Sequence, residues 1–175
     1  MNQGSRGYTH GHYEGILSAI SVGFFLILIG TIFVTTPNLL HNVDTFLNHF
    51  NTIQVGNTNT YVPAPQDLPI YIDAYLAVYL AAREFSLIWG VFLIAALGAR
   101  FLLDSPLRRK AENIGDIVFW LGATYLIQTF LVVPTQTSII DNTNWFKFWA
   151  GVVMFIGVSL IARSIFLAVV RARNI

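Results

Sequence analysis

Residues 15–34 of the chain have the sequence GILSAISVGFFLILIGTIFV, which contains no charged side chain. About 20 consecutive apolar residues, at a rise of 1.5 Å each, form a helix that spans the roughly 30 Å hydrocarbon core of a bilayer. A cleaved secretory signal would have a shorter apolar stretch, followed by small residues at the cleavage site. Because this stretch leads instead into Thr35-Thr36-Pro37-Asn38, it predicts a retained membrane helix over residues 15–35.

The composition of the whole chain agrees with a membrane protein. Of its 175 residues, 55% are hydrophobic and only 11% are charged, whereas soluble domains carry about 25% charged residues. The formal net charge of +1 excludes a nucleic-acid binder that depends on a basic surface. The chain has no cysteine, which excludes disulfides, thiolate metal sites, iron–sulfur clusters and thiol catalysis.

Three further apolar segments follow, at residues 69–103, 116–133 and 145–170. The first of these would be about 50 Å long as a helix, so it either tilts strongly or projects from the membrane. Four spanning segments predict an all-α integral membrane protein built as a four-transmembrane-helix bundle. Two glycine pairs spaced by seven residues predict small-residue faces at which a neighbouring backbone can approach. These pairs are Gly23/Gly30 and Gly115/Gly122.

The distribution of basic residues predicts the orientation of the four segments. The connections at 36–68 and 134–144 contain no Lys or Arg, whereas the connection at 104–115 and the terminal residues 171–175 are basic. Cytoplasmic connections carry the excess of Lys and Arg. We therefore expect a cell-membrane protein whose termini, including the polar tail 1–14, are cytoplasmic. The basic residues concerned are Arg100, Arg108, Arg109, Lys110, Arg171 and Arg173.

The outer connection at 36–68 has two parts. Apolar residues at helical spacing predict an amphipathic helix at about 38–50. This helix either packs against the projecting end of the 69–103 helix or lies flat in the membrane interface. We favour packing, because its polar face has no basic residue to attract anionic lipid. The turn signal Gly56-Asn57 predicts a short hairpin of residues 52–55 against 60–62.

The 69–103 helix carries the most polar candidate site. If Arg100 marks the cytoplasmic boundary, Arg83 lies 17 residues away, or about 25 Å, and therefore near the outer boundary. Ionisable groups at a membrane boundary are costly unless they are paired, and they often mark function. Arg83 is either a structural anchor that pairs with an acid or part of a binding or permeation site. The candidate residues are Asp73, Tyr79, Arg83, Glu84 and Gln128.

A second charged set lies at the cytoplasmic boundary and predicts ion pairs that lock the helices together. Arg163 is expected to pair with Asp104 or Asp116. The basic run in the same connection is typical of a site for an anionic lipid head group. The ion-pair residues are Arg100, Asp104, Asp116 and Arg163, and the head-group residues are Arg108, Arg109 and Lys110.

His10 and His12 form the most concentrated set of metal ligands in the sequence. Two imidazoles at this spacing can bind Cu, Ni or Zn. The alternative is a solvated tail, since the surrounding sequence is rich in Gly and polar residues. No histidine lies in the four apolar segments, which excludes a haem held by two histidines within the membrane. We expect no cofactor.

Enzyme motifs do not occur in the sequence: it contains no H-E-x-x-H, G-x-S-x-G, P-loop or G-x-G-x-x-G. We therefore expect that the protein is not an enzyme. The favoured hypothesis is a structural or accessory membrane protein that assembles by helix packing, either with itself or as a subunit of a larger membrane complex. The rival is an oligomeric channel or carrier for an ion or small solute, built around the 69–103 helix.

The orientation is tested by labelling single cysteines, because the chain has none of its own. A cysteine at Asn57 should react with a membrane-impermeant reagent from outside the cell, and one at Lys110 only from the cytoplasmic side. Labelling of the Lys110 position from outside would overturn every depth assigned above.

Overall fold

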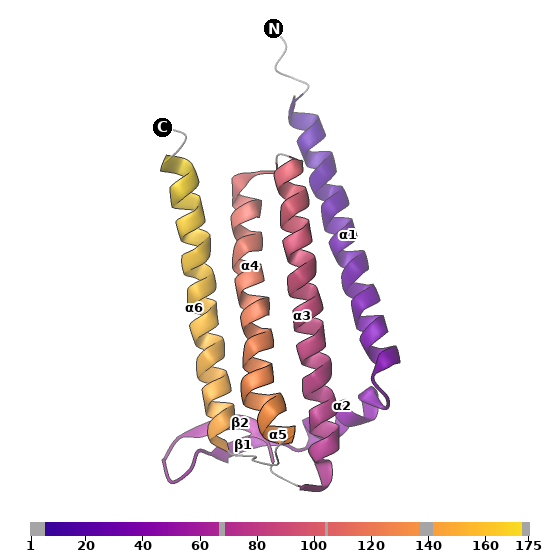
Figure 1. The fold of residues 1–175 in the computed structure, drawn as a ribbon, viewed down its shortest axis with the longest axis vertical. Helices are drawn as coiled ribbons and strands as arrows, with labels where there is room; N and C mark the ends of the chain where they lie inside the picture. Colours follow the sequence, from indigo (N-terminus) through magenta and orange to yellow (C-terminus); the bar gives the residue numbers. More distant parts are fainter. Residues whose placement is uncertain (1–5, 67–68, 104, 137–141, 173–175) are drawn as a thin grey trace.

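A computed structural model describes residues 6–66, 69–103, 105–136 and 142–172. Within these ranges it describes the side chains from residue 15 onward, except those of residues 69 and 142. Within these ranges the chain is mostly helical and has one β-hairpin (Figure 1). The elements in chain order are α1 (Arg6–Thr35), α2 (Leu39–Asn48), β1 (Phe50–Gln54), β2 (Tyr61–Pro65), the 3-10 helix η1 (Pro69–Tyr71), α3 (Ile72–Leu102), α4 (Leu107–Leu126), the π-helix η2 (Ile127–Val132), α5 (Val133–Gln136) and α6 (Asn142–Ala172).

Four helical segments are long and apolar enough to cross a membrane, which confirms the prediction of a multi-pass helical membrane protein. They are Gly15–Thr35, Ile72–Leu102, Leu107–Gln136 and Thr143–Ala172.

Two boundaries differ from the sequence prediction. Residues 6–14, expected within a tail, continue α1 towards the N-terminus. The basic connection expected at 104–115 is largely helical, since α4 begins at Leu107. Pro106 directly precedes this start, and proline suits the first positions of a helix because no N–H is needed there.

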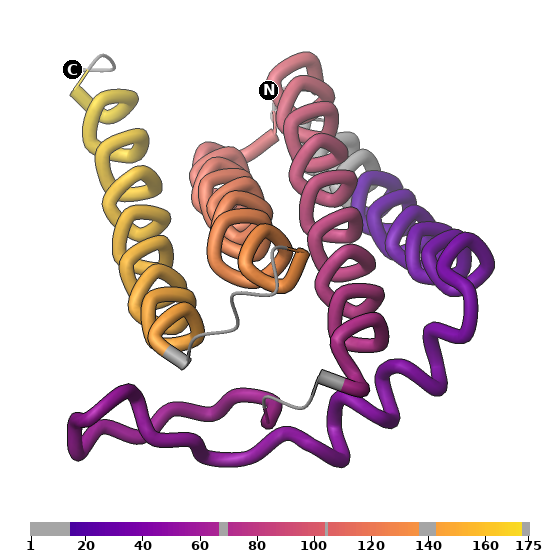
Figure 2. The backbone as a smooth tube through the Cα atoms, turned by 60° about the horizontal axis from the view of Figure 1, so that its bottom comes forward, coloured from indigo at the N-terminus to yellow at the C-terminus, as the bar shows by residue number. Residues whose placement is uncertain are grey.

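The four long helices stand side by side in the order α6, α4, α3, α1 (Figure 1), and the view from below shows the same order (Figure 2). The main contacts join α1 to α3, α3 to α4 and α4 to α6, so α1 and α6 form the two ends of an open row. The sequence predicted a four-helix bundle without predicting which helices are neighbours, and the structure arranges the four as an open row. Lipid tails cover apolar helix faces as well as another helix does, so the hydrophobic effect does not drive closure inside a bilayer.

The row has two chemically distinct ends. The hairpin end carries α2, β1 and β2, while the basic end carries the α3–α4 connection, the start of α1 and the end of α6 (Figure 1). The described basic residues near the α3–α4 turn and near the end of α6 therefore lie together at the basic end. They are Arg100, Arg108, Arg109, Lys110, Arg163 and Arg171.

α1 packs on α3 through aromatic rings. The Phe24 ring stacks on Phe92 with centroids 4.2 Å apart, and Phe25 meets Trp89 edge-on at 5.5 Å. Leu28, one turn further along α1, is buried in the same contact. These residues lie in the middle and hairpin-end parts of α1, so that is where the two helices are held together.

α4 packs on α6 through small residues. A Cβ at Gly122 would overlap the Phe155 ring, and one at Gly115 would come within 3.2 Å of the Ser159 carbonyl oxygen. The glycine pair of α4 therefore allows the close backbone approach that its spacing predicted.

The glycine pair of α1 is used differently. A Cβ at Gly23 or Gly30 would meet no other described atom within 4 Å. At 100° per residue, both glycines lie on the side of α1 opposite Phe24 and Leu28, and so on the side away from α3. Within the described part of the chain, this face has no helix packed against it.

The segment between α1 and α3 crosses the hairpin end of the row (Figure 2). α2 packs on α3, and β1 pairs with β2 in antiparallel register, with Ile53 opposite Val62. Trp149 of α6 donates its indole N–H to the carbonyl oxygen of Pro63 at 2.8 Å. This segment therefore links the middle of the row to its far end.

Five aromatic residues, which we name the Trp145 cluster, join α2, β1, α3 and α6. The Phe46 ring of α2 lies 5.9 Å from both Tyr75 and Tyr79 of α3. Trp145 of α6 lies 6.0 Å from Tyr79 and 5.8 Å from Phe50 of β1. Tyr75, Tyr79 and Trp145 are buried. Edge-to-face aromatic pairs contribute about 0.5–1.5 kcal/mol each beyond their burial, so this cluster is a strong tie at the hairpin end.

The α4–α6 contact predicts a contrast between two alanine substitutions. Gly122→Ala should lower the free energy of unfolding by about 1–3 kcal/mol, because the new methyl group overlaps the Phe155 ring. The control Gly30→Ala should be neutral or slightly stabilising, since it adds helix propensity in open space. Unfolding in detergent micelles measures both, and equal stability of the two variants would contradict this packing.

Candidate functional site at Arg83

Arg83 of α3 lies at the centre of a polar network within the apolar row. Its Nη1 donates a hydrogen bond of 2.7 Å to Oε1 of Gln128 in η2. Its Nη2 lies 3.6 Å from Oε1 of Glu84, and the Arg83 side chain is 29% exposed. The sequence predicted these three residues as one set, and the structure brings them together.

Gln128 reaches Arg83 from a widened stretch of helix. Residues 127–132 form the π-helix η2, and Pro134 follows it directly in α5. Proline has no N–H, and in an α-helix its ring clashes with the carbonyl four residues earlier. Inserting a π-turn is a known way to relieve such a clash, and π-turns are frequent at functional sites. The sequence predicted that the helix ends at Pro134, but the helix widens there and continues to Gln136.

Glu84 projects from the row at the same level. Its side chain is 48% exposed, on a face of α3 that is otherwise apolar. Leu87 and Val91, three and seven residues further on, share this face and are exposed too. Arg83 thus lies between a neutral partner inside the row and an acidic partner at the edge of an apolar surface.

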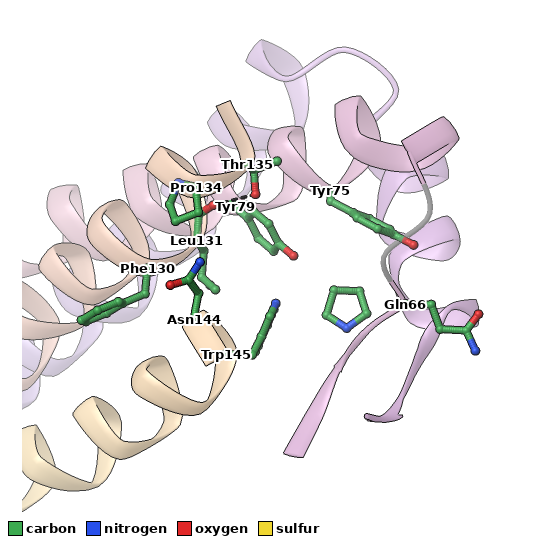
Figure 3. A pocket seen from close by; sticks show the side chains of 10 residues that line it. Gln66, Tyr75, Tyr79, Phe130, Leu131, Pro134, Thr135, Asn144 and Trp145 are labelled. Atoms are coloured by element: carbon green, nitrogen blue, oxygen red, sulfur yellow. Dashed lines mark hydrogen bonds between the residues drawn. The ribbon is translucent and has the colours of Figure 1, made fainter. Parts of the chain in front are cut away.

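Tyr79 and Asp73 do not join this network. Tyr79 belongs to the Trp145 cluster, and Asp73 is exposed in the first turn of α3, where a negative charge is favoured by the helix dipole. A small cavity of about 20 Å³ lies beside the tyrosines, and Figure 3 shows Tyr75, Tyr79 and Trp145 around it. This volume has room for about one water molecule, so the cavity is too small for an organic solute.

The basic end has its own hub, at Glu112 of α4. This carboxylate lies 3.0 Å from Arg108, 3.4 Å from Arg109 and 3.2 Å from Arg163 of α6. Arg163 therefore pairs with Glu112, one turn before Asp116, whereas the sequence predicted Asp104 or Asp116 as its partner. One carboxylate serves three guanidinium groups, so a positive excess remains at this end.

The other predicted residues of the basic end are placed as follows. Arg100 donates a hydrogen bond of 3.2 Å to the backbone oxygen of Arg109, and Asp116 is exposed. Asp104 lies outside the described residues. Lys110 is buried, with its Nζ 4.8 Å from the centre of the Phe101 ring, so it is not available to a lipid head group. In the cysteine-labelling experiment, Arg108 is therefore a better cytoplasmic position than Lys110, because its side chain is 81% exposed.

The predicted metal ligands His10 and His12 lie outside the described side chains. Among the side chains that the structure does describe, no group of three His, Asp or Glu residues is arranged to hold a metal ion.

Two polar contacts between helices were not predicted from the sequence. The first is the contact of Glu112 with Arg163. The sequence does indicate that Glu112 forms ion pairs, since Arg108 and Arg109 lie four and three residues before it, at pairing distance on a helix. Asn113 is buried and donates a hydrogen bond of 2.8 Å to the carbonyl oxygen of Leu93 in α3. No sequence pattern identifies this bond, because its acceptor is a backbone group.

These side chains are suited to joining helices and to holding charge. Arg83–Gln128 and Asn113–Leu93 connect α3 to the α4–η2 segment, and Arg163–Glu112 connects α6 to α4.

Comparison of the chain with protein-family profiles, curated proteins and solved structures gives no match.

The Arg83–Gln128 contact is tested by a double-mutant cycle of Arg83→Met and Gln128→Leu. A hydrogen bond to a charged group contributes about 1.5–3 kcal/mol, so the two changes should show a coupling energy of about that size. The coupling of Arg83→Met with Glu84→Gln should be below about 1 kcal/mol, because Glu84 is half exposed. Arg83→Lys should recover part of the loss. Unfolding in micelles measures both cycles, and zero coupling to Gln128 would refute the structural role of the bond.

Proposed function

We propose that the protein is a structural or accessory membrane subunit that assembles laterally by helix packing, with itself or within a larger membrane complex. The positive-inside rule supports a cell-membrane orientation with both termini in the cytoplasm, so that the hairpin end faces outward. The protein has no enzymatic activity in this proposal.

The open row of helices is the observation that carries this proposal. A ring of helices can line a path, but a single row of four has no central axis, and α1 and α6 stand at its opposite ends (Figure 2). The polar groups within the row are used by one another: Arg83 bonds Gln128, and Arg163 bonds Glu112. Each chain therefore offers broad, preformed helix faces for lateral contacts, while the polar groups inside the row bond one another.

The α1 face that carries Gly23 and Gly30 is the surface best suited to a partner helix. Ala19 precedes Gly23 by four residues on the same side, and small residues at this spacing let another helix backbone approach closely. The matching glycines of α4 are already occupied by α6, which shows how this spacing is used within the same chain.

Leucine substitutions at the two ends of the row test lateral assembly. Gly23→Leu should reduce the mass of the assembly extracted in native-membrane nanodiscs and leave the melting temperature of the subunit unchanged, because no described atom lies near that glycine. Gly157→Leu on α6 is the matched control, since it too points into open space, and it should keep the assembly intact.

The proposal is wrong if the wild-type chain is monomeric in such nanodiscs and no other protein co-elutes with it. Loss of mass in the Gly157→Leu variant alone would move the interface from α1 to α6.

The second candidate is an oligomeric channel or carrier built around α3. It is favoured by Glu84, which places a half-exposed carboxylate on an apolar face beside Arg83. In an oligomer centred on this face, Glu84 side chains from several chains would line a shared path. Reconstituted vesicles distinguish the two candidates: a channel conducts ions or a solute and Glu84→Gln changes the flux, whereas an accessory subunit gives none.

A further inference from the structure

The basic-end halves of α1 and α3 are separated by an open crevice. α1 contacts α3 through Phe24, Phe25 and Leu28, but nearer the basic end α3 presents only short side chains. An apolar hollow of about 220 Å³ results. Its lining residues are Leu17, Ile20 and Ser21 of α1 and Phe92, Ala95, Ala96 and Ala99 of α3.

A polar hollow of about 340 Å³ lies at the basic-end mouth of this crevice, lined by Gly15, Ser18, Ser21, Arg100 and Arg109. Ser21 lines both hollows, so the polar mouth and the apolar crevice adjoin. Two guanidinium groups thus lie next to an apolar slot.

The described acids neutralise the positive charge at this mouth only in part, because Asp116 interacts electrostatically with Arg100 without forming a salt bridge with it. Arg109 shares the Glu112 carboxylate with Arg108 and Arg163. Arg100 uses Nη1 on a backbone oxygen, and its Nε is buried with no acceptor among the described residues. A negatively charged group that accepts hydrogen bonds is the complement of this arrangement.

We propose that this crevice binds an anionic phospholipid. The phosphate lies at Arg100 and Arg109, and one acyl chain lies along α3 from Ala99 towards Phe92, a distance of about 10 Å along the helix axis. Basic pockets between membrane helices are suited to head groups in this way, and the apolar slot selects a lipid over a free phosphate. This site does not depend on the proposed lateral assembly.

The site differs from the one expected in the basic run 108–110. Lys110 is buried against Phe101, and Arg108 points to Glu112. Arg109 belongs both to the basic run and to the crevice. Arg100 contributes the second charge of the crevice, because the end of α3 lies beside the start of α4.

The test is native mass spectrometry of the full chain in detergent, with phosphatidylglycerol and phosphatidylcholine as probes. The wild type should retain phosphatidylglycerol about tenfold more strongly than phosphatidylcholine, since only the former has net negative charge. Arg100→Gln should weaken phosphatidylglycerol binding about tenfold, the expected effect of losing one charge-assisted contact. Arg108→Gln, at the same end but outside the crevice, should not.

A second variant tests the acyl slot without changing any charge. Ala96→Phe fills the crevice and should also reduce phosphatidylglycerol retention about tenfold. Ile94→Phe, on an exposed face of α3 away from the crevice, is its matched control and should bind as the wild type does. Unchanged melting temperatures without added lipid show that all variants are folded.

Three results would overturn the proposal. Equal retention of the two lipids would show that the site does not select for charge. Full retention of phosphatidylglycerol by the Ala96→Phe variant would show that the acyl chain binds outside this crevice. Displacement of the lipid by millimolar inorganic phosphate would identify a free-anion site in place of a lipid site.

Discussion

The Trp145 cluster is the contact on which the arrangement of the helices depends. Within a bilayer, apolar helix faces gain little from one another that lipid does not also supply. The cluster lies at the hairpin end, where its α3 residues Tyr79 and Tyr75 are four and eight residues before Arg83. Phe46 and Trp145 pack against them there. Burial from water is strongly favourable there. It holds α3 and α6 in position across the end of α4, and the hairpin fastens the same end through Trp149.

Between the two ends, the row is aligned by a few polar contacts of high specificity. Arg83–Gln128 and Asn113–Leu93 set the position of α3 against α4, and Glu112–Arg163 sets α6. An unpaired polar group in lipid is costly, so each contact penalises a helix that slides or rotates. Glycine contacts and polar contacts thus act together at α4, which packs on α3 on one side and on α6 on the other.

The openness of the row connects its architecture to the two roles proposed for it. Among the described residues, α1 packs on α3 mainly through Phe24, Phe25 and Leu28. This leaves a glycine face on one side and a crevice with an arginine mouth at the basic end. The first suits a partner helix, and the second suits a lipid. Both follow from one physical fact, that lipid solvates whatever the helices leave uncovered.

The sequence by itself determined the number of spanning helices and the grouping of their charges, because both follow from the composition of local segments. It also placed Arg83, Glu84 and Gln128 in one set, since counting 1.5 Å per residue brings them to one depth. Only the tertiary structure decided which helices are neighbours: lipid-facing and protein-facing residues are equally apolar, so no hydrophobic pattern distinguishes a row from a bundle. The partner of Arg163 was likewise decided by helix rotation, which brings Glu112 into reach ahead of Asp116. Pro134 shows the same limit: the sequence predicts that the helix ends there, whereas a π-helix precedes Pro134 and the helix continues to Gln136. Local π-turns can accommodate a proline within a membrane helix, and the sequence gives no signal for them.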